Sequence, residues 1–316
     1  MLNKKSVAVV LPAYNEELLL PDTLAGIPAF VDRIYVVDDA SRDGTVGRAH
    51  AAAADDPRIF VMVQERNAGV GAAVVAGYKR AIADRMDVIC VMNSDNQMDP
   101  DELESLAGPV ARGELDYTKA NRLFTGQAWE LIPHTRYLGN AALSLLTKIA
   151  SGYWHIADSQ AGYTAIALPM LEQLQLDHIY PRYGYPNDML VHLNVWNARV
   201  RDIPSRPIYD IGEKSGIRLR KVVPTISWLL LKRFLWRLGN KYVIRDFHPL
   251  VFFYTFGFLS TVFGLAIGIW QTAERVFVGG SPTAGSVGLI ALFLMFGVLF
   301  TLFAMWFDME TNKDLR

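Results

Sequence analysis

Short apolar runs alternate with amphipathic stretches along the first hundred residues of the chain. Four of the runs are rich in β-branched residues and bounded by turn formers, and they predict strands at 6–11, 33–38, 59–64 and 88–92. The stretches between them predict helices at 17–27, 45–54 and 71–83. Strands separated by helices of this size predict an α/β fold, in which helices cover both faces of a mostly parallel sheet.

Two later segments also have the pattern of helices. Residues 134–151 predict an amphipathic helix. Residues 223–238 are apolar but contain two tryptophans, Trp228 and Trp236, and three basic residues, Lys232, Arg233 and Arg237. This mixture is typical of an amphipathic helix lying at a membrane interface. A buried helix of the globular domain is the alternative interpretation.

Two uncharged apolar stretches near the end of the chain predict membrane-spanning helices. Residues 251–270 and 287–307 comprise twenty and twenty-one residues without a charge. A helix rises about 1.5 Å per residue and must cross about 30 Å of hydrocarbon, so both stretches are long enough. The hydrophobic content of 51% also favours a membrane protein, and a pair of buried core helices is the alternative.

The charge distribution predicts the orientation in the membrane. Between Arg199 and Arg245 the chain has twelve Lys or Arg and three acidic residues, directly before the first apolar stretch. Basic residues beside a span mark the cytoplasmic side, and two spans return the chain to that side. We therefore expect a globular domain at 1–222, an interfacial segment at 223–248 and two spans within 249–316, with the globular domain and both termini in the cytoplasm.

Three further features limit the function classes. The net charge of −1 gives no reason to propose a nucleic-acid partner. The single cysteine, Cys90, cannot form an internal disulfide, which suits a reducing compartment. The apolar run before Pro12 is too short for a secretory signal peptide.

Three polar clusters directly follow predicted strands. They read PAYNE at 12–16, DDASRDGT at 38–45 and NSDNQ at 93–97. Because ligands of parallel sheets bind beyond the carboxyl ends of the strands, we expect the clusters to converge on one crevice. Each cluster alone is also compatible with a turn or a helix cap, but their order and spacing together indicate a binding site.

With these clusters, the chain resembles the family 2 glycosyltransferases of the GT-A fold, and more narrowly the dolichyl- or undecaprenyl-phosphate sugar synthases. The resemblance extends over nearly the whole chain, to NAGVG at 67–71, KANR at 119–122, Asp158 with Gly162 and Tyr163, GEKS at 212–215 and the paired apolar stretches. It implies a Rossmann-like GT-A domain that transfers one sugar from a UDP- or GDP-sugar to a polyprenyl phosphate with inversion, giving a β-linked product.

The resemblance also implies which residues bind the nucleotide-sugar. These are Pro12, Tyr14, Glu16, Val37, Asp39, Asn93, Ser94 and Asp95. A carboxylate accepts hydrogen bonds from a base or a ribose, and a tyrosine ring packs against a base. Because Val70 stands where the family usually has lysine, only a tight turn into a helix is expected of the NAGVG segment.

The NSDNQ cluster corresponds to the D-x-D motif with which the family holds a divalent cation. Such a cation stabilises the leaving diphosphate as a Lewis acid. Asp95 and Gln97 match the motif, whereas Asn93 replaces its first aspartate. The neutral oxygen of Asn93 still suits Mg²⁺ or Mn²⁺ but predicts weaker binding, and Asp95 is expected to be a catalytic residue as well as a ligand. A loop that leads into a helix and binds no metal is the alternative.

The acceptor implied by the resemblance is a phosphate monoester, which is mostly a dianion near neutral pH. A dianion is already a nucleophile, so the protein mainly has to offset repulsion between two phosphate groups, a task that suits arginine. The candidate acceptor-binding residues are Arg122, Arg136, Asn140, Arg206 and Ser215. Asp158 matches a residue proposed as a base in relatives, and it either acts in catalysis, orients the acceptor or holds an arginine.

Two other functions are compatible with parts of the sequence. A processive polysaccharide synthase shares the early motifs, but it carries a Q-x-x-R-W motif that this sequence lacks. A non-catalytic membrane scaffold descended from an enzyme is compatible with Asn93. By analogy with two-span relatives, we also expect a homo-oligomer, and tetramers occur among those relatives.

Overall fold

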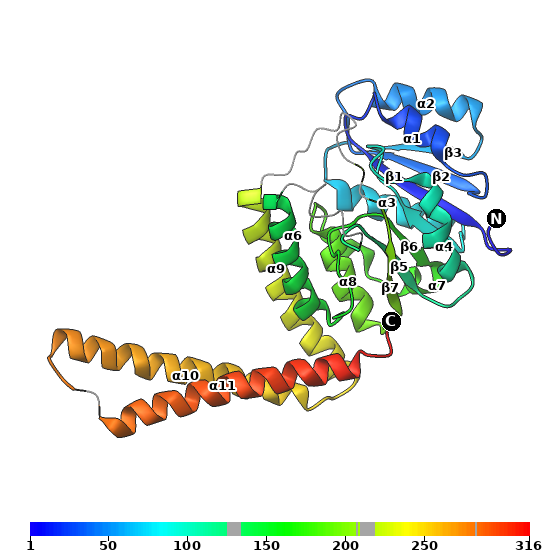
Figure 1. Cartoon of the computed structure of the whole chain (residues 1–316). Coiled ribbons are helices and arrows are strands. Elements are labelled where there is room, and N and C mark those ends of the chain that lie inside the picture. The colour runs from blue at the N-terminus through cyan, green and yellow to red at the C-terminus, as the bar shows by residue number, and fades with distance from the viewer. Residues whose placement is uncertain (125–133, 207, 209–218, 282) are drawn as a thin grey trace. The chain divides into compact units, whose positions relative to one another are not determined.

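The computed structural model describes residues 1–124, 134–206, 208, 219–281 and 283–316, without the side chains of 134–138, 140 and 219–221. The chain divides into two compact units, Met1–Phe234 with Asp314–Arg316 and Leu235–Lys313. The division falls within one helix, α9 (Leu219–Gly239). Figure 1 shows the elements in chain order.

A seven-stranded sheet in the order β3-β2-β1-β4-β6-β5-β7 forms the centre of the first unit (Figure 1). Its strands are β1 (Val7–Ala13), β2 (Arg33–Asp38), β3 (Ile59–Val63), β4 (Val88–Val91), β5 (Tyr117–Asn121), β6 (Thr164–Ala167) and β7 (Val200–Pro204). Neighbouring strands are parallel except for β6, which runs antiparallel to β4 and β5. The four predicted strands correspond to β1 to β4, and the mostly parallel sheet is confirmed.

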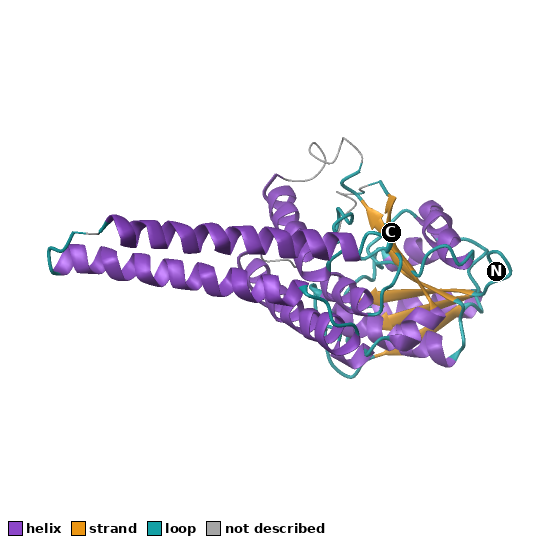
Figure 2. Cartoon of the chain, turned by 90° about the horizontal axis from the view of Figure 1, so that it is seen from below, coloured by secondary structure: helices purple, strands orange, loops and turns teal. Residues whose placement is uncertain are grey.

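Helices cover both faces of the sheet, as predicted (Figure 2). On one face, α3 (Val70–Ala83), α7 (Leu168–Gln173) and α8 (Tyr185–Val195) pack with the strand residues that include Val10 and Ile89. On the other face, α1 (Leu20–Gly26), α2 (Thr45–Asp55) and α4 (Leu103–Ala111) pack with the set that includes Leu11 and Cys90. Consecutive strand residues thus enter two different cores, which explains why the strands are apolar throughout.

The remaining elements of the first unit are short helices and one longer helix. Two 3-10 helices span Pro100–Glu102 and Leu176–His178. Helix α6 (His134–Ser151) has the predicted bounds. It contacts α8 through a hydrogen bond of 2.7 Å from Asn187 Nδ2 to Thr147 Oγ1.

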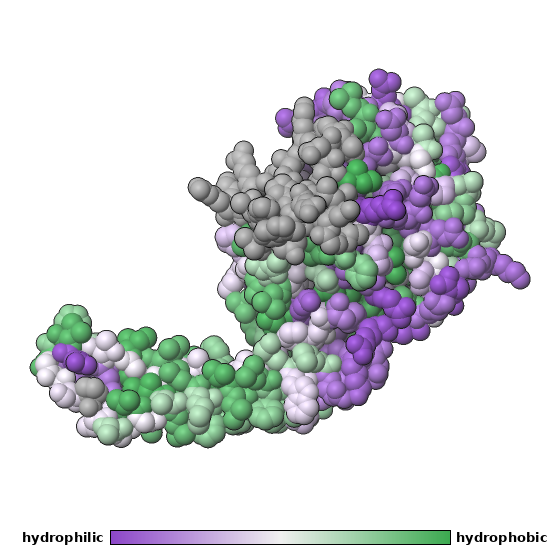
Figure 3. All heavy atoms as spheres, in the orientation of Figure 1, coloured by the Kyte–Doolittle hydropathy of each residue, from purple (hydrophilic) through white to green (hydrophobic). Residues whose placement is uncertain are grey.

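Two long apolar helices, α10 (Leu250–Phe277) and α11 (Ala284–Thr311), form a hairpin in the second unit. Each is 28 residues long, and both are long and apolar enough to cross a membrane, in agreement with the predicted spans. Apolar residues dominate the surface of the hairpin (Figure 3). The two helices approach closely at Gly257 and Gly297, where an added β-carbon would clash with the opposite helix.

A buried ion pair joins the end of α9 to α11 within the second unit. Arg237 and Asp308 are both fully buried, and two hydrogen bonds of 2.9 Å connect them. The Tyr242 hydroxyl, in a π-helix that spans Asn240–Arg245, donates to the same carboxylate at 2.6 Å. Arg237, one of the three basic residues of the predicted interfacial helix, therefore lies inside the protein because it neutralises a buried carboxylate.

The packing of α3 against β1 generates a prediction about Gly77. A β-carbon at this position would clash with the side chain of Val10, so Gly77→Ala should lower the free energy of unfolding by about 1–3 kcal/mol. Gly47→Ala in α2 is the control, because nothing lies within 4 Å of the added carbon there. That control should be neutral or stabilise the helix by up to about 1 kcal/mol. Thermal unfolding of both purified variants in detergent measures the difference, and equal stability would contradict the close packing.

Candidate active site

The loops that follow β1, β2 and β4 lie together at the carboxyl ends of these neighbouring parallel strands. The Ser94 hydroxyl donates to the Pro12 carbonyl at 2.8 Å, which joins the loops after β4 and β1. The backbone N–H of Glu16 donates to Thr45 Oγ1 at 2.8 Å, which joins the loop after β1 to the start of α2. The three polar clusters therefore meet at one edge of the sheet, as their positions after the strands predict.

Two residues that sequence reasoning did not single out fix the shape of the first two loops. Asn15 has a positive φ of 58°, a conformation that asparagine tolerates better than most residues. Its Oδ1 accepts a hydrogen bond from the backbone N–H of Arg42 at 2.9 Å. Glu17 Oε2 accepts from the backbone N–H of Gly44 at 2.7 Å. In the sequence, the only sign of these roles is that both residues lie among turn-forming residues. Many solvent-exposed loops have the same composition.

The candidate donor-binding residues differ in their exposure. Tyr14 is exposed, so its ring is accessible to a planar ligand. Val37 is fully buried in the core between the sheet and α3, so its side chain is not accessible. Pro12 and Ser94 are also buried and contact each other. Among these four residues, only Tyr14 offers an exposed side chain.

The buried carboxylate of Asp39 holds the glycine-rich turn that opens α3. Its two oxygens accept hydrogen bonds from the backbone N–H groups of Ala68 and Gly69, at 2.7 and 2.8 Å. Gly69 has a φ of 105°, which favours glycine because it has no side chain. The expected tight turn is therefore present at 67–71, and a carboxylate from the neighbouring loop supports it.

Glu16 lies in a negatively charged part of the site. Its pKa is raised to about 7, mainly by burial and in addition by the nearby charges of Asp95 and Asp43. Two or three carboxylates that repel one another form a favourable environment for a cation. Each of the loops after β1, β2 and β4 thus contributes one of these acidic side chains to the same part of the site.

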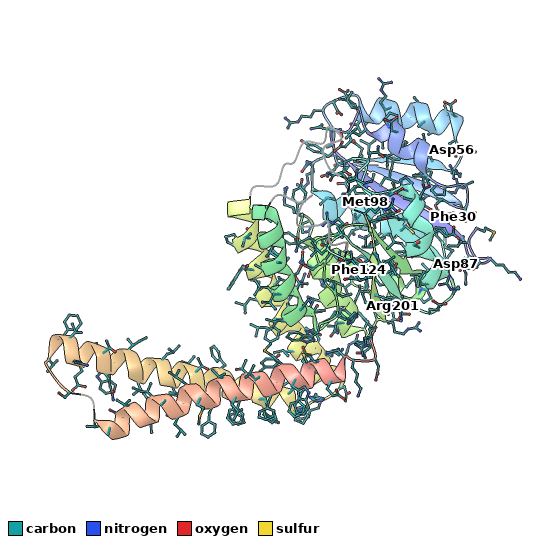
Figure 4. The ribbon with its side chains drawn as sticks, in the orientation of Figure 1. Phe30, Asp56, Asp87, Met98, Phe124 and Arg201 are labelled. Carbon is teal, nitrogen blue, oxygen red and sulfur yellow. The ribbon has the colours of Figure 1, made fainter. Side chains whose placement is uncertain are left out.

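The loop after β4 has ligands that suit a hard divalent cation. Asp95 Oδ1 accepts from the backbone N–H of Gln97 at 3.2 Å, and the N–H of Asn93 contacts the sulfur of Met98 at 3.1 Å. Figure 4 labels Met98. Among the residues that the structure describes, no group of three or more His, Cys, Asp or Glu is placed to hold a metal. Mg²⁺ is commonly bound by one or two carboxylates together with substrate phosphates, so the carboxylate and amide oxygens of this loop fit a cation shared with a diphosphate.

An ion pair between the partly exposed Arg122 and the buried Asp158 lies at the end of β5. Arg122 Nε and Nη2 donate to the two oxygens of Asp158 at 2.8 and 3.3 Å. Asp158 is 1% exposed, whereas the arginine side chain is 29% exposed. Burial favours the neutral acid, but the charge of Arg122 and its hydrogen bonds outweigh that effect and hold the pKa of Asp158 below its usual range. Asp158 therefore pairs with Arg122 as a carboxylate, and its part in catalysis stays a prediction.

A second pair of charged residues, Lys119 and Asp202, lies side by side in the adjacent strands β5 and β7. Lys119 is fully buried and donates to the Ala161 carbonyl, and burial lowers its pKa. Asp202 accepts from Asn121 Nδ2 at 3.1 Å and from the backbone N–H of Ala157 at 2.7 Å, and burial raises its pKa. Sequence reasoning noted Lys119 only as part of the KANR motif and missed Asp202. The sequence signal that could have identified this pair is a charged residue inside each of the short strands β5 and β7.

The ends of β5 and β7 bring two acceptor candidates to the same edge. These strands are parallel neighbours in which Asn121 pairs with Pro204, so Arg122 and Arg206 follow adjacent strand ends. Glu102 fixes the second segment, because its carboxylate accepts from Ser205 Oγ at 2.5 Å and from the Arg206 N–H at 2.9 Å. Sequence reasoning treated Glu102 only as part of a helix start.

Three acceptor candidates lie where the structure gives no side chain. Arg136 and Asn140 are on the described backbone of α6, but their side chains are outside the described residues. Ser215 is outside the described residues altogether. Their roles stay predictions.

Comparisons with known proteins agree with this geometry. The family model described as glycosyl transferase family 2 matches residues 8–174. Undecaprenyl-phosphate mannosyltransferase of Micrococcus luteus is 30% identical over 234 residues, which are 72% of this chain and 95% of the relative. UDP-N-acetylglucosamine–dolichyl-phosphate N-acetylglucosaminyltransferase of Methanococcus voltae is 25% identical over 218 residues, 65% of this chain and 86% of the relative.

A solved structure has the same fold. It is glucosyl-3-phosphoglycerate synthase from Mycobacterium tuberculosis, determined with Mn²⁺, uridine diphosphate and glucosyl-3-phosphoglycerate. The two structures match with a TM-score of 0.53 and 22% sequence identity, over 75% of this chain and 81% of the other. At this identity the likeness concerns the fold alone.

The environment of Glu16 predicts a pH dependence of stability. The folded protein keeps this carboxyl protonated up to about pH 7, whereas the unfolded chain loses the proton near pH 4.5. The folded state therefore binds more protons in this interval, and the free energy of unfolding falls as pH rises through it. Glu16→Gln should unfold like the native protein at pH 4 and be more stable at pH 8, by about 1 kcal/mol or less because the half-buried group is partly screened.

Denaturant unfolding with a metal chelator present measures this effect. The exposed residue Glu104 on α4 provides the matched control Glu104→Gln. An equal difference between native and Glu16→Gln protein at both pH values would contradict the assigned environment.

Proposed function

Because this chain belongs to glycosyl transferase family 2, we propose that it transfers a single sugar from a nucleotide-sugar to a polyprenyl phosphate. The observation that carries the proposal is the meeting of two kinds of site at one sheet edge: a loop after β4 with the carboxylate of Asp95 and amide side chains, and an arginine held by buried Asp158 after β5. The names of the relatives from Micrococcus luteus and Methanococcus voltae support the polyprenyl acceptor.

The donor nucleotide binds at the ends of β1, β2 and β4 in this proposal. Tyr14 packs against the base, and the carboxylates of Glu16 and Asp39 accept hydrogen bonds from the base or the ribose. Pro12, Val37 and Ser94 shape this part of the site through the backbone and the core, since their side chains are buried. The donor is a UDP- or GDP-sugar.

Asn93, Asp95 and Gln97 would hold Mg²⁺ or Mn²⁺. When bound, the cation stabilises the negative charge that develops on the leaving diphosphate. Asp95 supplies the charged oxygen of this set, and Asn93 and Gln97 supply neutral ones. The mutual repulsion around Glu16 and Asp95 is a reason for a cation to bind here.

The acceptor phosphate binds on the other side of the reacting sugar. Arg122, Arg136 and Arg206 neutralise it, with Asn140 and Ser215 as neutral partners. An oxygen of the phosphate dianion attacks the anomeric carbon, and the bond from that carbon to the diphosphate breaks with inversion, so an α-linked donor gives a β-linked product. Asp158 takes part by holding Arg122, and no proton has to be removed from the dianion.

The same proposal includes the cellular setting. The two apolar helices span a membrane, most of α9 together with the residues that follow it provides the interfacial segment at 223–248, and the globular domain at 1–222 and both termini lie in the cytoplasm. The chain assembles as a homo-oligomer, with a tetramer as the form suggested by two-span relatives.

A transfer assay tests the function directly. Purified protein is incubated with polyprenyl phosphate, Mg²⁺ or Mn²⁺ and a panel of radiolabelled UDP- and GDP-sugars, and the label extracted into organic solvent is counted. Metal-dependent lipid label from one donor would establish the function and identify the sugar. Nucleotide binding without transfer from any donor would favour the scaffold hypothesis, for which Asn93 is the relevant residue.

Removing the charged ligand generates the first prediction. Asp95→Ala should lower kcat at least about 100-fold, because several kcal/mol of charge stabilisation on the diphosphate is lost. The exposed residue Asp101 on the following 3-10 helix gives the control Asp101→Ala, which should keep native activity. Asn93→Asp should stay active and need less metal for half-maximal rate. Near-native turnover of folded Asp95→Ala protein would contradict the metal assignment.

The ion pair with Asp158 generates a second prediction. Arg122→Ala should raise the KM for polyprenyl phosphate about 10- to 100-fold and leave the KM for the donor within about twofold. Arg122→Lys keeps a positive charge beside the buried carboxylate and should show a smaller effect. The exposed Arg201 in β7, labelled in Figure 4, gives the control Arg201→Ala. A change in donor KM alone would assign Arg122 to the other phosphate.

A further inference from the structure

Residues 180–184, which precede α8, form a segment that packs against the glycine-rich turn at 69–71. The Pro181 carbonyl accepts a hydrogen bond of 3.0 Å from the backbone N–H of Ala72 at the start of α3. A β-carbon at Gly69 would lie 2.5 Å from the same carbonyl, and one at Gly71 would clash with the Tyr180 carbonyl. The two glycines therefore allow direct backbone contact between the turn and the 180–184 segment.

The opposite side of this segment is held by α9, within the first unit. Arg233 Nε lies 2.6 Å from Asp188 Oδ1, and Arg233 Nη2 donates to Asp188 Oδ2 at 3.1 Å and to the His178 carbonyl at 2.5 Å. Asp188 Oδ2 in turn accepts from the backbone N–H of Tyr180 at 2.7 Å. The ion pair thus fixes both the beginning of the segment, at Tyr180, and His178 two positions before it.

The positive charge of Arg233 compensates the buried carboxylate of Asp188. Asp188 is fully buried, and burial raises its pKa while Arg233 opposes that effect. The buried His192, whose Nε2 is 3.7 Å from Asp188, is held neutral because burial and the charge of Arg233 lower its pKa to about 3. Arg233 is therefore the cation that the described contacts provide for this carboxylate, and its loss leaves a buried charge without compensation.

A continuous series of contacts results. It leads from Arg233 to Asp188, then through the Tyr180 N–H to the Pro181 carbonyl, which contacts the start of α3 next to the turn at 69–71. The N–H of Gly69 in this turn donates to Asp39. Every step is a hydrogen bond, an ion pair or a backbone contact.

We propose that Arg233 and Asp188 are positioning residues for the donor half of the site: they press the 180–184 segment onto the turn at 69–71 and thereby fix Asp39. The inference rests on the proposed function, because it takes Asp39 as a donor-binding residue. In this proposal α9 stabilises, through Arg233, the conformation of the sheet end that binds the nucleotide, in addition to any contact that the helix makes with lipid.

The test uses the purified full-length protein and compares Arg233→Ala with Lys232→Ala. Lys232 is the adjacent basic residue and lies over the ring of exposed Trp228, away from Asp188, so it is a matched control. Arg233→Ala should raise the donor KM about tenfold and leave the acceptor KM within about twofold, whereas Lys232→Ala should change neither. Arg233→Lys, which keeps the charge but not the fork of donors, should recover part of the loss and covers the case in which the alanine variant fails to fold.

Hydrogen exchange followed by mass spectrometry provides a second readout that requires no substrate. Peptides covering 66–74 should exchange faster in Arg233→Ala than in the native protein, because the N–H groups of Ala68, Gly69 and Ala72 lose fixed partners. Peptides from the distant α4 should not change. Faster exchange over the whole domain, or an equal rise of both KM values, would mean general destabilisation and overturn the proposal.

The two hypotheses can fail separately. Unchanged exchange and unchanged donor KM in Arg233→Ala and Arg233→Lys, in a protein that transfers sugar, would overturn the positioning role and leave the proposed function intact. Faster exchange at 66–74 in a protein that transfers no sugar would establish the contact series and overturn the proposed function instead.

Discussion

Parallel pairing of β1 with both β2 and β4 is the constraint on which the candidate site depends. It places the carboxyl ends of three strands side by side, so the loops that follow them share one edge. The register then brings Pro12 to Ser94 and Glu16 to Thr45, although the partners are 82 and 29 residues apart in the chain. The antiparallel strand β6 separates this group from β5 and β7, whose own parallel ends present Arg122 and Arg206. Both groups of candidate site residues thus arise from one sheet.

Three carboxylates, two of them buried and that of Glu102 partly buried, organise the loops around that edge. Asp39 holds the turn before α3, Asp158 holds Arg122, and Glu102 holds the segment after β7. A carboxylate has several lone pairs, so it can join two segments of backbone and keep a site that a ligand can use. Each of these groups is satisfied by N–H or O–H donors in the described structure, which is the condition for burying an acid. These residues therefore stabilise the loops of the site, in addition to any contact that they make with a substrate.

Much of the fold was predictable because its pattern is local. β-Branched runs predicted β1 to β4, periodicity predicted α3 and the bounds of α6, and charge-free length predicted α10 and α11. Strands β5, β6 and β7 were not predicted. They have only five, four and five residues, and β5 and β7 carry Lys119 and Asp202 inside the strand. Such charges are stable there only because partners from other elements compensate them, and no local pattern reports those partners.

The sequence by itself determined the α/β class, the two apolar helices and the identity of the motifs, because each depends on residues close together in the chain. Only the tertiary structure decided which oxygens already have partners. It pairs Asp158 with Arg122, gives the Asp39 carboxylate to a turn thirty residues away, and buries Arg237 against Asp308 although its helix suggested a membrane surface. The physical reason is that a charge is buried only beside a partner, and the partner is chosen by the packing of whole elements rather than by neighbouring residues.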